Sequence, residues 1–126
     1  MARKIAKSGI PTEAQEQTKL ATWLRKQGIR FTASANGGSR NLLEAMALKR
    51  SGVSPGFPDI EIPKPRGKYH GMYIEMKRAD GGVLSAHQAE WLNYLQKEGY
   101  YALSCAGFEE AKAQVVFYMS RNDQNA

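Results

Sequence analysis

Two acidic residues and a lysine in the middle of the sequence have the types and spacing of a metal-dependent hydrolytic site. Asp59 follows Pro58 in one short segment, and Glu75 and Lys77 stand two positions apart in another. Carboxylate oxygens are hard ligands that suit Mg²⁺ or Mn²⁺. A bound divalent ion activates water, and a neighbouring amine can offset transition-state charge. The residue types therefore indicate a hydrolytic site built around a divalent cation, if the fold brings them together.

A β-hairpin would bring them together. Residues 56–63 and 71–78 alternate apolar with polar side chains, as strands do, and a basic loop joins them. If the hairpin is symmetric about Gly67, Asp59 faces Glu75 with β-carbons about 5 Å apart. Facing like charges are destabilising unless a cation lies between them, which favours a divalent metal. In this register Ile60 faces Ile74 and Ile62 faces Met72, so these residues and Met76 share one face, which a one-residue slip would scramble.

The order of these residues resembles the PD-(D/E)xK nuclease motif. The fuller pattern is similar to the VRR-NUC family, in which a Gly-x-Pro-Asp strand precedes a Glu-x-Lys strand and a Ser-x-x-Gln helix. Here these are residues 56–59 (Gly-Phe-Pro-Asp), 75–77 (Glu-Met-Lys) and 85–88 (Ser-Ala-His-Gln). The resemblance covers residues 12 to 117. It implies a restriction-endonuclease-like α/β fold, a mixed β-sheet flanked by helices in the order α-β-α-β-β-α-β-α.

The resemblance also implies roles for individual residues. Asp59, Glu75 and Lys77 would be catalytic, together with Gln88, which would orient water or the lysine. Without the family pattern, Gln88 would be interpreted as a surface glutamine. The metal, Mg²⁺ or Mn²⁺, would be held by Asp59, Glu75 and the backbone carbonyl of Met76.

A further metal ligand is expected from the first helix. The family spacing of Glu, Gln and an aliphatic residue matches Glu13, Gln17 and Leu20, with Glu16 as the reserve candidate on the same helix face. The alternative is that both glutamates only complement the helix dipole.

The elements around the hairpin follow from periodicity and end signals. We expect helices over residues 12–27, 41–50, 85–98 and 108–119, and strands over residues 29–34 and 100–105. Residues 1–11 are expected to form a flexible basic arm, residues 12–119 the nuclease domain and residues 120–126 a polar tail. The buried faces of the helices should include Leu20, Trp23 and Leu24; Leu42, Leu43, Met46 and Ala47; Ala89, Leu92 and Leu95; and Ala111, Val115 and Val116.

Length and composition restrict the class of protein. The 126 residues are enough for one domain, and the net charge of +6 suits an anionic partner, nucleic acid first, or else a merely basic surface. The single cysteine, Cys105, lies in an apolar run and is interpreted as a core residue. One cysteine favours a reducing compartment. We expect a cytoplasmic, nucleoid-associated protein, which a phage or a bacterium could encode. No apolar run is long enough to cross a membrane.

Several basic, polar and aromatic residues are candidates for contacts with nucleic acid. The turn at residues 36–40 could hold a phosphate with its backbone and Arg40, although it could equally be an ordinary turn. The hairpin loop is expected to lie beside the active site, with cations on the phosphates and an aromatic ring on an unpaired base. The alternative is a solvated hairpin loop. The candidates are Asn36, Arg40, Lys64, Arg66, Lys68, Tyr69 and Arg78.

The substrate implied by the resemblance is branched DNA such as a Holliday junction. A chain of this size has one site, so symmetric cleavage of two strands requires a homodimer. The alternatives are a flap or nicking nuclease, an inactive module that binds branched DNA, and a metal-binding fold with a small anionic substrate.

Overall fold

The protein is described from a computed structural model that covers residues 9–34 and 41–122. Its helices and strands follow one another in the predicted order α-β-α-β-β-α-β-α. They are α1 (Glu13–Lys26), β1 (Thr32–Ala33), α2 (Leu42–Arg50), β2 (Ile60–Ile62), β3 (Met72–Lys77), α3 (Ala86–Lys97), β4 (Tyr101–Ala106) and α4 (Gly107–Met119). Among the described residues, no helix is both long and apolar enough to cross a membrane.

The four strands form one mixed sheet in the order β1-β2-β3-β4. The first three strands are antiparallel, and β4 runs parallel to β3 after the crossover through α3. Within the hairpin, Ile60 pairs with Ile74 and Ile62 pairs with Met72. The register predicted from the alternation of apolar residues is therefore confirmed.

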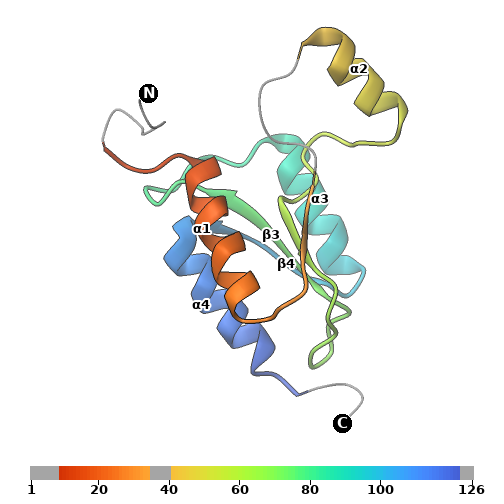
Figure 1. Cartoon of the computed structure of the whole chain (residues 1–126). Helices are drawn as coiled ribbons and strands as arrows, with labels where there is room; N and C mark the ends of the chain where they lie inside the picture. The colour runs from red at the N-terminus through yellow and green to blue at the C-terminus, as the bar shows by residue number, and fades with distance from the viewer. Residues whose placement is uncertain (1–8, 35–40, 123–126) are drawn as a thin grey trace.

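The helices lie on both faces of the sheet, with α1 and α4 on one face and α3 on the other (Figure 1). Residues at alternate positions of β2 and β3 point to the α1–α4 side, where they form the main core. The opposite face packs a smaller, more aromatic cluster under α3. The main core contains Leu20, Leu24, Ile60, Ile62, Met72, Ile74, Met76, Cys105, Ala111, Val115 and Tyr118, and the smaller cluster contains Tyr73, Leu92, Leu95 and Ala102.

Capping boxes fix the starts of α1, α2 and α3. The side chains of Thr12, Asn41 and Ser85 each accept a hydrogen bond from the backbone of the third helical residue, whose own side chain bonds back to the cap. Such reciprocal caps satisfy two backbone donors that a helix start leaves unpaired. The box of α3 holds Gln88 in the first turn of that helix, which determines where its amide can reach.

Helix α2 differs from the sequence-based expectation. It forms over the expected residues, but its apolar side chains do not point into the core of this chain. Leu42, Leu43 and Met46 are 74%, 77% and 46% exposed, Ala47 is exposed as well, and no residue of α2 is buried. The helix stands apart from the layered body (Figure 1). Two smaller errors of the same kind are Ala89 and Val116, which are exposed on α3 and α4.

A close contact between the start of α3 and the segment before β2 holds the two halves of the site together. Gly56 has a φ of +83°, and a β-carbon there would lie 2.6 Å from the backbone of His87 and 2.7 Å from the amide nitrogen of Gln88. Glycine provides both the left-handed backbone and the room for this approach. The bend three residues before Asp59 is therefore packed directly against the helix that carries Gln88.

Substitution of Gly56 should be far more destructive than substitution of a glycine that has the same backbone but no neighbour. Gly81 has a φ of +85° with nothing within 4 Å of its virtual β-carbon. Gly81→Ala should lower the free energy of unfolding by about 1 kcal/mol, the cost of a left-handed alanine. Gly56→Ala should cost about 1–3 kcal/mol more, because the helix start must move. Urea denaturation of both variants measures the difference, and equal losses would show that the contact does not matter.

Candidate functional site

The carboxyl groups of Asp59 and Glu75 lie together at the end of the hairpin where β3 finishes. The β2–β3 register, continued by one residue, sets them opposite each other, and their side chains share a hydrogen bond. The Oδ2 atom of Asp59 also accepts a hydrogen bond from the backbone N–H of Met76 at 2.7 Å. The fold thus brings the two predicted carboxylates to one place.

Lys77 completes this group through Gln88. The Nζ atom of Lys77 donates to Oε1 of Gln88 at 2.9 Å, and Nε2 of Gln88 donates to Oε2 of Glu75 at 3.0 Å. The Gln88 amide is therefore a bridge between the amine and one carboxylate. Its orientation is fixed because the N–H of Ser85 also donates to Oε1, at 2.9 Å.

Burial makes this group of charges costly to assemble. Glu75 and Lys77 are 3% and 7% exposed. Burial, and then the charge of Asp59, raises the pKa of Glu75 to about 8. Burial also raises the pKa of Asp59, against the opposing effects of the Met76 N–H and of Lys77. A buried carboxyl group and a half-buried one in contact disfavour double ionisation unless positive charge enters the site.

Comparison with known proteins identifies the family. The model of the VRR-NUC domain matches residues 11–109. The chain belongs to the VRR-NUC family. A solved structure named "VRR_NUC domain protein" superposes with a TM-score of 0.78 at 30% sequence identity, covering 89% of this chain and 91% of that one. No curated protein matches the chain.

Membership of the VRR-NUC family implies a nuclease activity and hence binding to DNA. Nucleases of this PD-(D/E)xK type are usually dependent on a divalent metal. Within residues 9–34 and 41–122, no group of three His, Cys, Asp or Glu side chains is arranged to hold a metal ion. The donors nevertheless fit a hard cation, because two facing carboxyl groups supply oxygen ligands and the charge that it would neutralise.

The two glutamates of α1 have separate environments. Glu13 lies at the edge of the site, with Oε2 3.9 Å from Nζ of Lys77 and its side chain 48% exposed. Glu16 is 4% exposed and its Oε1 accepts a hydrogen bond from the backbone N–H of Phe108 at 3.0 Å. Glu16 thus caps the start of α4, because the N-cap residue of that helix, Ala106, makes no side-chain capping hydrogen bond. Its contact is structural, whereas Glu13 remains the predicted acidic contribution of α1.

The hairpin loop does not lie beside the predicted catalytic residues, so the expectation that it borders the active site was wrong. The Arg66–Tyr69 bridge closes the hairpin at the end away from Asp59 and Glu75. With a rise of about 3.3 Å per residue along β3, the loop is roughly 15–20 Å from Glu75. The loop joins β2 to β3 at one end of the hairpin, whereas Asp59 and Glu75 lie at the other end. The length of the strands therefore separates the loop from the two carboxyl groups.

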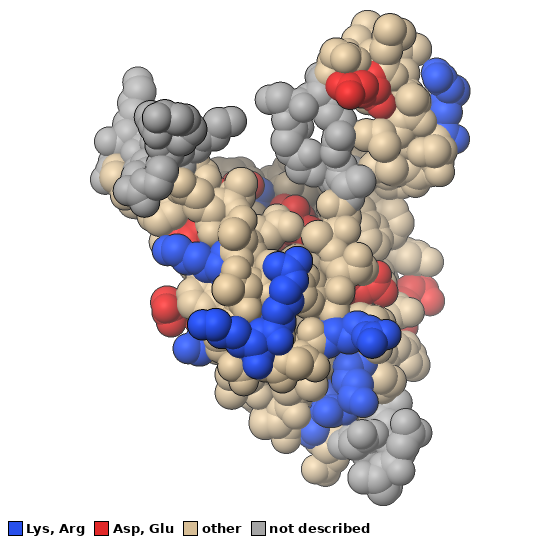
Figure 2. Space-filling view, viewed as in Figure 1, with Lys and Arg blue, Asp and Glu red and all other residues tan. Residues whose placement is uncertain are grey.

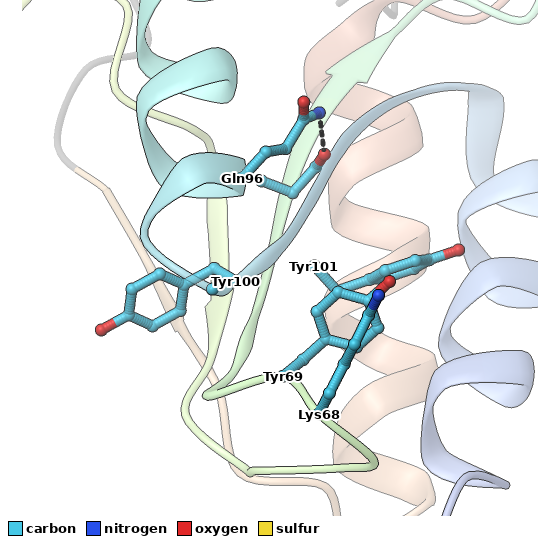
Figure 3. A pocket seen from close by; sticks show the side chains of 7 residues that line it. Lys68, Tyr69, Gln96, Tyr100 and Tyr101 are labelled. Carbon is cyan, nitrogen blue, oxygen red and sulfur yellow. Dashed lines mark hydrogen bonds between the residues drawn. The ribbon is translucent and has the colours of Figure 1, made fainter.

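The side chains of this loop are also engaged elsewhere. Tyr69 packs against the stacked rings of Tyr101 and Tyr118, with ring centroids 5.1 and 6.3 Å away, and it lies against the main core. Together with Lys68 it borders a hollow of about 520 Å³ beside β4 (Figure 3). These contacts disfavour Tyr69 as a free platform for an unpaired base. DNA contacts by Lys64, Arg66 and Lys68 remain predictions.

The other predicted DNA contacts divide into two groups. Asn36 and Arg40, with the rest of their turn, lie outside the described residues, as do most of the N-terminal arm and the last four residues of the tail. Arg78 is described, and its Nε lies 3.3 Å from Oδ1 of Asp80 in a half-exposed ion pair. In Figure 2, Lys and Arg side chains gather over the middle and lower part of the visible face, which agrees with an anionic partner.

Cys105 has the core position expected from the sequence. Its side chain is 1% exposed, and burial raises the pKa of its thiol to about 12. A thiol in this state is not a nucleophile at neutral pH.

One neighbour of the carboxylates was missed from the sequence. The N–H of Ser34 donates to the backbone carbonyl of Asp59 at 2.9 Å, which extends the pairing of β1 with β2. The strand containing Ser34 was expected, but the register of a two-residue strand cannot be inferred from a sequence pattern. No local signal therefore connected Ser34 to Asp59.

The raised pKa of Glu75 predicts how stability depends on pH in the absence of metal. The folded state holds a proton that the unfolded chain releases near pH 4.5, so the stabilisation is complete below that pH and is lost as pH rises towards about 8. In EDTA, the melting temperature should therefore fall between about pH 5 and pH 8.5. Glu75→Gln should flatten the curve, and Mn²⁺ at pH 8 should restore the wild type only. Scanning fluorimetry measures both, and parallel curves for the two proteins would refute the assignment.

Proposed function

We propose that this VRR-NUC domain is a metal-dependent endonuclease that hydrolyses phosphodiester bonds in branched DNA. The observation that supports it best is the pair of facing carboxyl groups, Glu75 buried and Asp59 half-buried, linked through Gln88 to Lys77. Such a pair of carboxyl groups is unfavourable in the absence of metal, which argues that the site normally holds a cation.

Asp59 and Glu75 would hold Mg²⁺ or Mn²⁺ with their carboxylates, and Met76 with its carbonyl. The N–H of Met76 points towards β2, since it donates to Asp59. In a regular antiparallel ladder the carbonyl of the same residue points the same way and accepts from the opposing residue, which here would be Pro58. Proline has no N–H. The Met76 carbonyl is thus left without its ladder donor, beside both carboxylates, where a hard cation would use it.

The remaining residues would act around this centre. When bound, the metal polarises the scissile phosphate and lowers the pKa of the attacking water. Lys77 orients or helps to deprotonate that water, or offsets charge that develops on the phosphate. Gln88 holds the Lys77 amine in place from one side, and Glu13 lies near it from the other. No covalent intermediate with the protein is required.

Loss of any of the three charged residues should abolish cleavage without unfolding the protein. Asp59→Ala, Glu75→Ala and Lys77→Ala should each lower the rate at least about 100-fold, because each removes a charge that acts on the transition state. The assay uses labelled four-way junction, flap, duplex and single-stranded DNA with Mg²⁺, Mn²⁺ or EDTA.

The substrate panel separates the proposed function from its alternatives. Paired cuts in the four-way junction support a junction nuclease, and cleavage of flaps alone supports a flap or nicking enzyme. Circular dichroism controls for folding, and Lys97→Ala, exposed in the last turn of α3 at the opposite end from Gln88, is a charge-removal control. Full activity of a folded Asp59→Ala, Glu75→Ala or Lys77→Ala protein excludes the assignment, and tight binding without cleavage by the wild type identifies an inactive module.

The substrate preference depends on assembly, and α2 supports a homodimer. Leu42, Leu43 and Met46 have helical spacing that places them on one side of α2, yet all three are exposed. A contiguous apolar surface of this kind is typical of a protein interface. A second copy of this chain is the partner that we propose for it, because a two-fold dimer provides the two sites that symmetric cleavage needs.

A charge on α2 should therefore disrupt the dimer. Leu43→Lys should weaken self-association at least about 30-fold, the effect of losing an interface hot spot. Val116→Lys is the matched control, because Val116 is 53% exposed on α4, away from α2. Sedimentation equilibrium should show a wild-type dimer, an intact Val116→Lys dimer and a Leu43→Lys monomer. A monomeric wild type would instead favour the flap or nicking enzyme.

A further inference from the structure

Ser34 stands next to Asp59 in the row of side chains that crosses the sheet at the site. Thr32 pairs with Glu61 and Ala33 pairs with Ile60, so the next pair in this antiparallel register is Ser34 with Asp59. The hydrogen bond from the Ser34 N–H to the Asp59 carbonyl, 2.9 Å long, shows that the pairing continues there. Directly opposed residues point to the same face, with β-carbons about 4.5–5.5 Å apart.

The hydroxyl of Ser34 is buried but unused. Its Oγ atom has no hydrogen-bond partner within the described part of the chain, one of two such buried side-chain atoms. A buried hydroxyl without a partner destabilises the fold, because it has given up its hydrogen bonds to water. Such groups in folded proteins call for an explanation, and a hydrogen bond that forms only in the functional state is one.

Asp59 is the group that can supply that partner. Its Oδ2 atom is already held by the Met76 N–H on the β3 side. Ser34 approaches from β1, on the opposite flank of the same residue. A carboxylate that binds a metal is normally itself hydrogen-bonded, which fixes its orientation. On the β3 side, the Met76 N–H already donates to the Asp59 carboxyl group. On the β1 side, the Ser34 hydroxyl is available to donate a second hydrogen bond.

We propose that Ser34 is a positioning residue of the metal site, whose hydroxyl donates a hydrogen bond to the Asp59 carboxylate when the divalent ion is bound. This inference rests on the proposed function, since it requires Asp59 to be a metal ligand. Ser34 itself contacts neither metal nor substrate. Its effect is to reduce the freedom of the Asp59 side chain in the loaded site.

The test is the affinity for Mn²⁺, measured by isothermal titration calorimetry and by electron paramagnetic resonance without DNA. Ser34→Ala should weaken Mn²⁺ binding about 10-fold, as the loss of a group that supports a ligand does. Ser34→Thr, which keeps the hydroxyl, should bind as the wild type does. Thr32→Ala is the matched control, on the same strand and one pair further from Asp59, and it should change nothing.

Melting in EDTA separates positioning from a structural role. Ser34→Ala should melt at or slightly above the wild-type temperature, because it removes an unpaired buried hydroxyl. Wild-type affinity in Ser34→Ala, or a loss in Ser34→Thr as large as in Ser34→Ala, overturns the inference while leaving the nuclease proposal intact. A wild-type protein that binds no Mn²⁺, with Asp59→Ala indistinguishable from it, overturns the metal site itself and Ser34's role with it.

Discussion

The proximity of two carboxyl groups inside a folded hairpin is the constraint on which the rest of the site depends. Asp59 and Glu75 share a hydrogen bond, and burial holds the pKa of Glu75 near 8. Only a proton or a cation can relieve the repulsion between them. The hairpin register makes this proximity unavoidable, because moving either residue by one position would also turn Ile60, Ile62 and Ile74 out of the core. The packing of the hydrophobic core thus keeps the two carboxyl groups together despite their repulsion.

The surrounding contacts keep this arrangement rigid. Gln88 is held by the capping box of α3, and from there its amide reaches both Glu75 and Lys77. Gly56 lets the segment before Asp59 touch the same helix start. Glu16 ties α1 to α4 through the Phe108 N–H, which in turn keeps Glu13 near Lys77. Side chains supported in this way keep a fixed orientation, as a site that positions a substrate requires.

The hairpin and the start of α3 could be predicted from the sequence because each depends on a local residue pattern. Alternating apolar residues gave the hairpin register, and Ser85 with Gln88 marked the start of α3. The errors concern information that local patterns lack. The apolar residues of α2 indicate a buried face but not the molecule that buries it. The basic loop at residues 64–70 was expected beside the site because it is close to Glu75 in sequence. In the structure, the extended strand β3 separates the loop from Glu75. Ser34 meets Asp59 through a two-residue strand whose pairing is set by tertiary structure alone.

Anomalous scattering from a crystal grown with Mn²⁺ tests the central claim most directly. The account predicts a peak between the carboxylates of Asp59 and Glu75, about 2.0–2.3 Å from an oxygen of each and from the Met76 carbonyl. A crystal soaked to high Mn²⁺ concentration that shows no peak there, or shows the two carboxyl groups turned apart around an ion bound elsewhere, would contradict it.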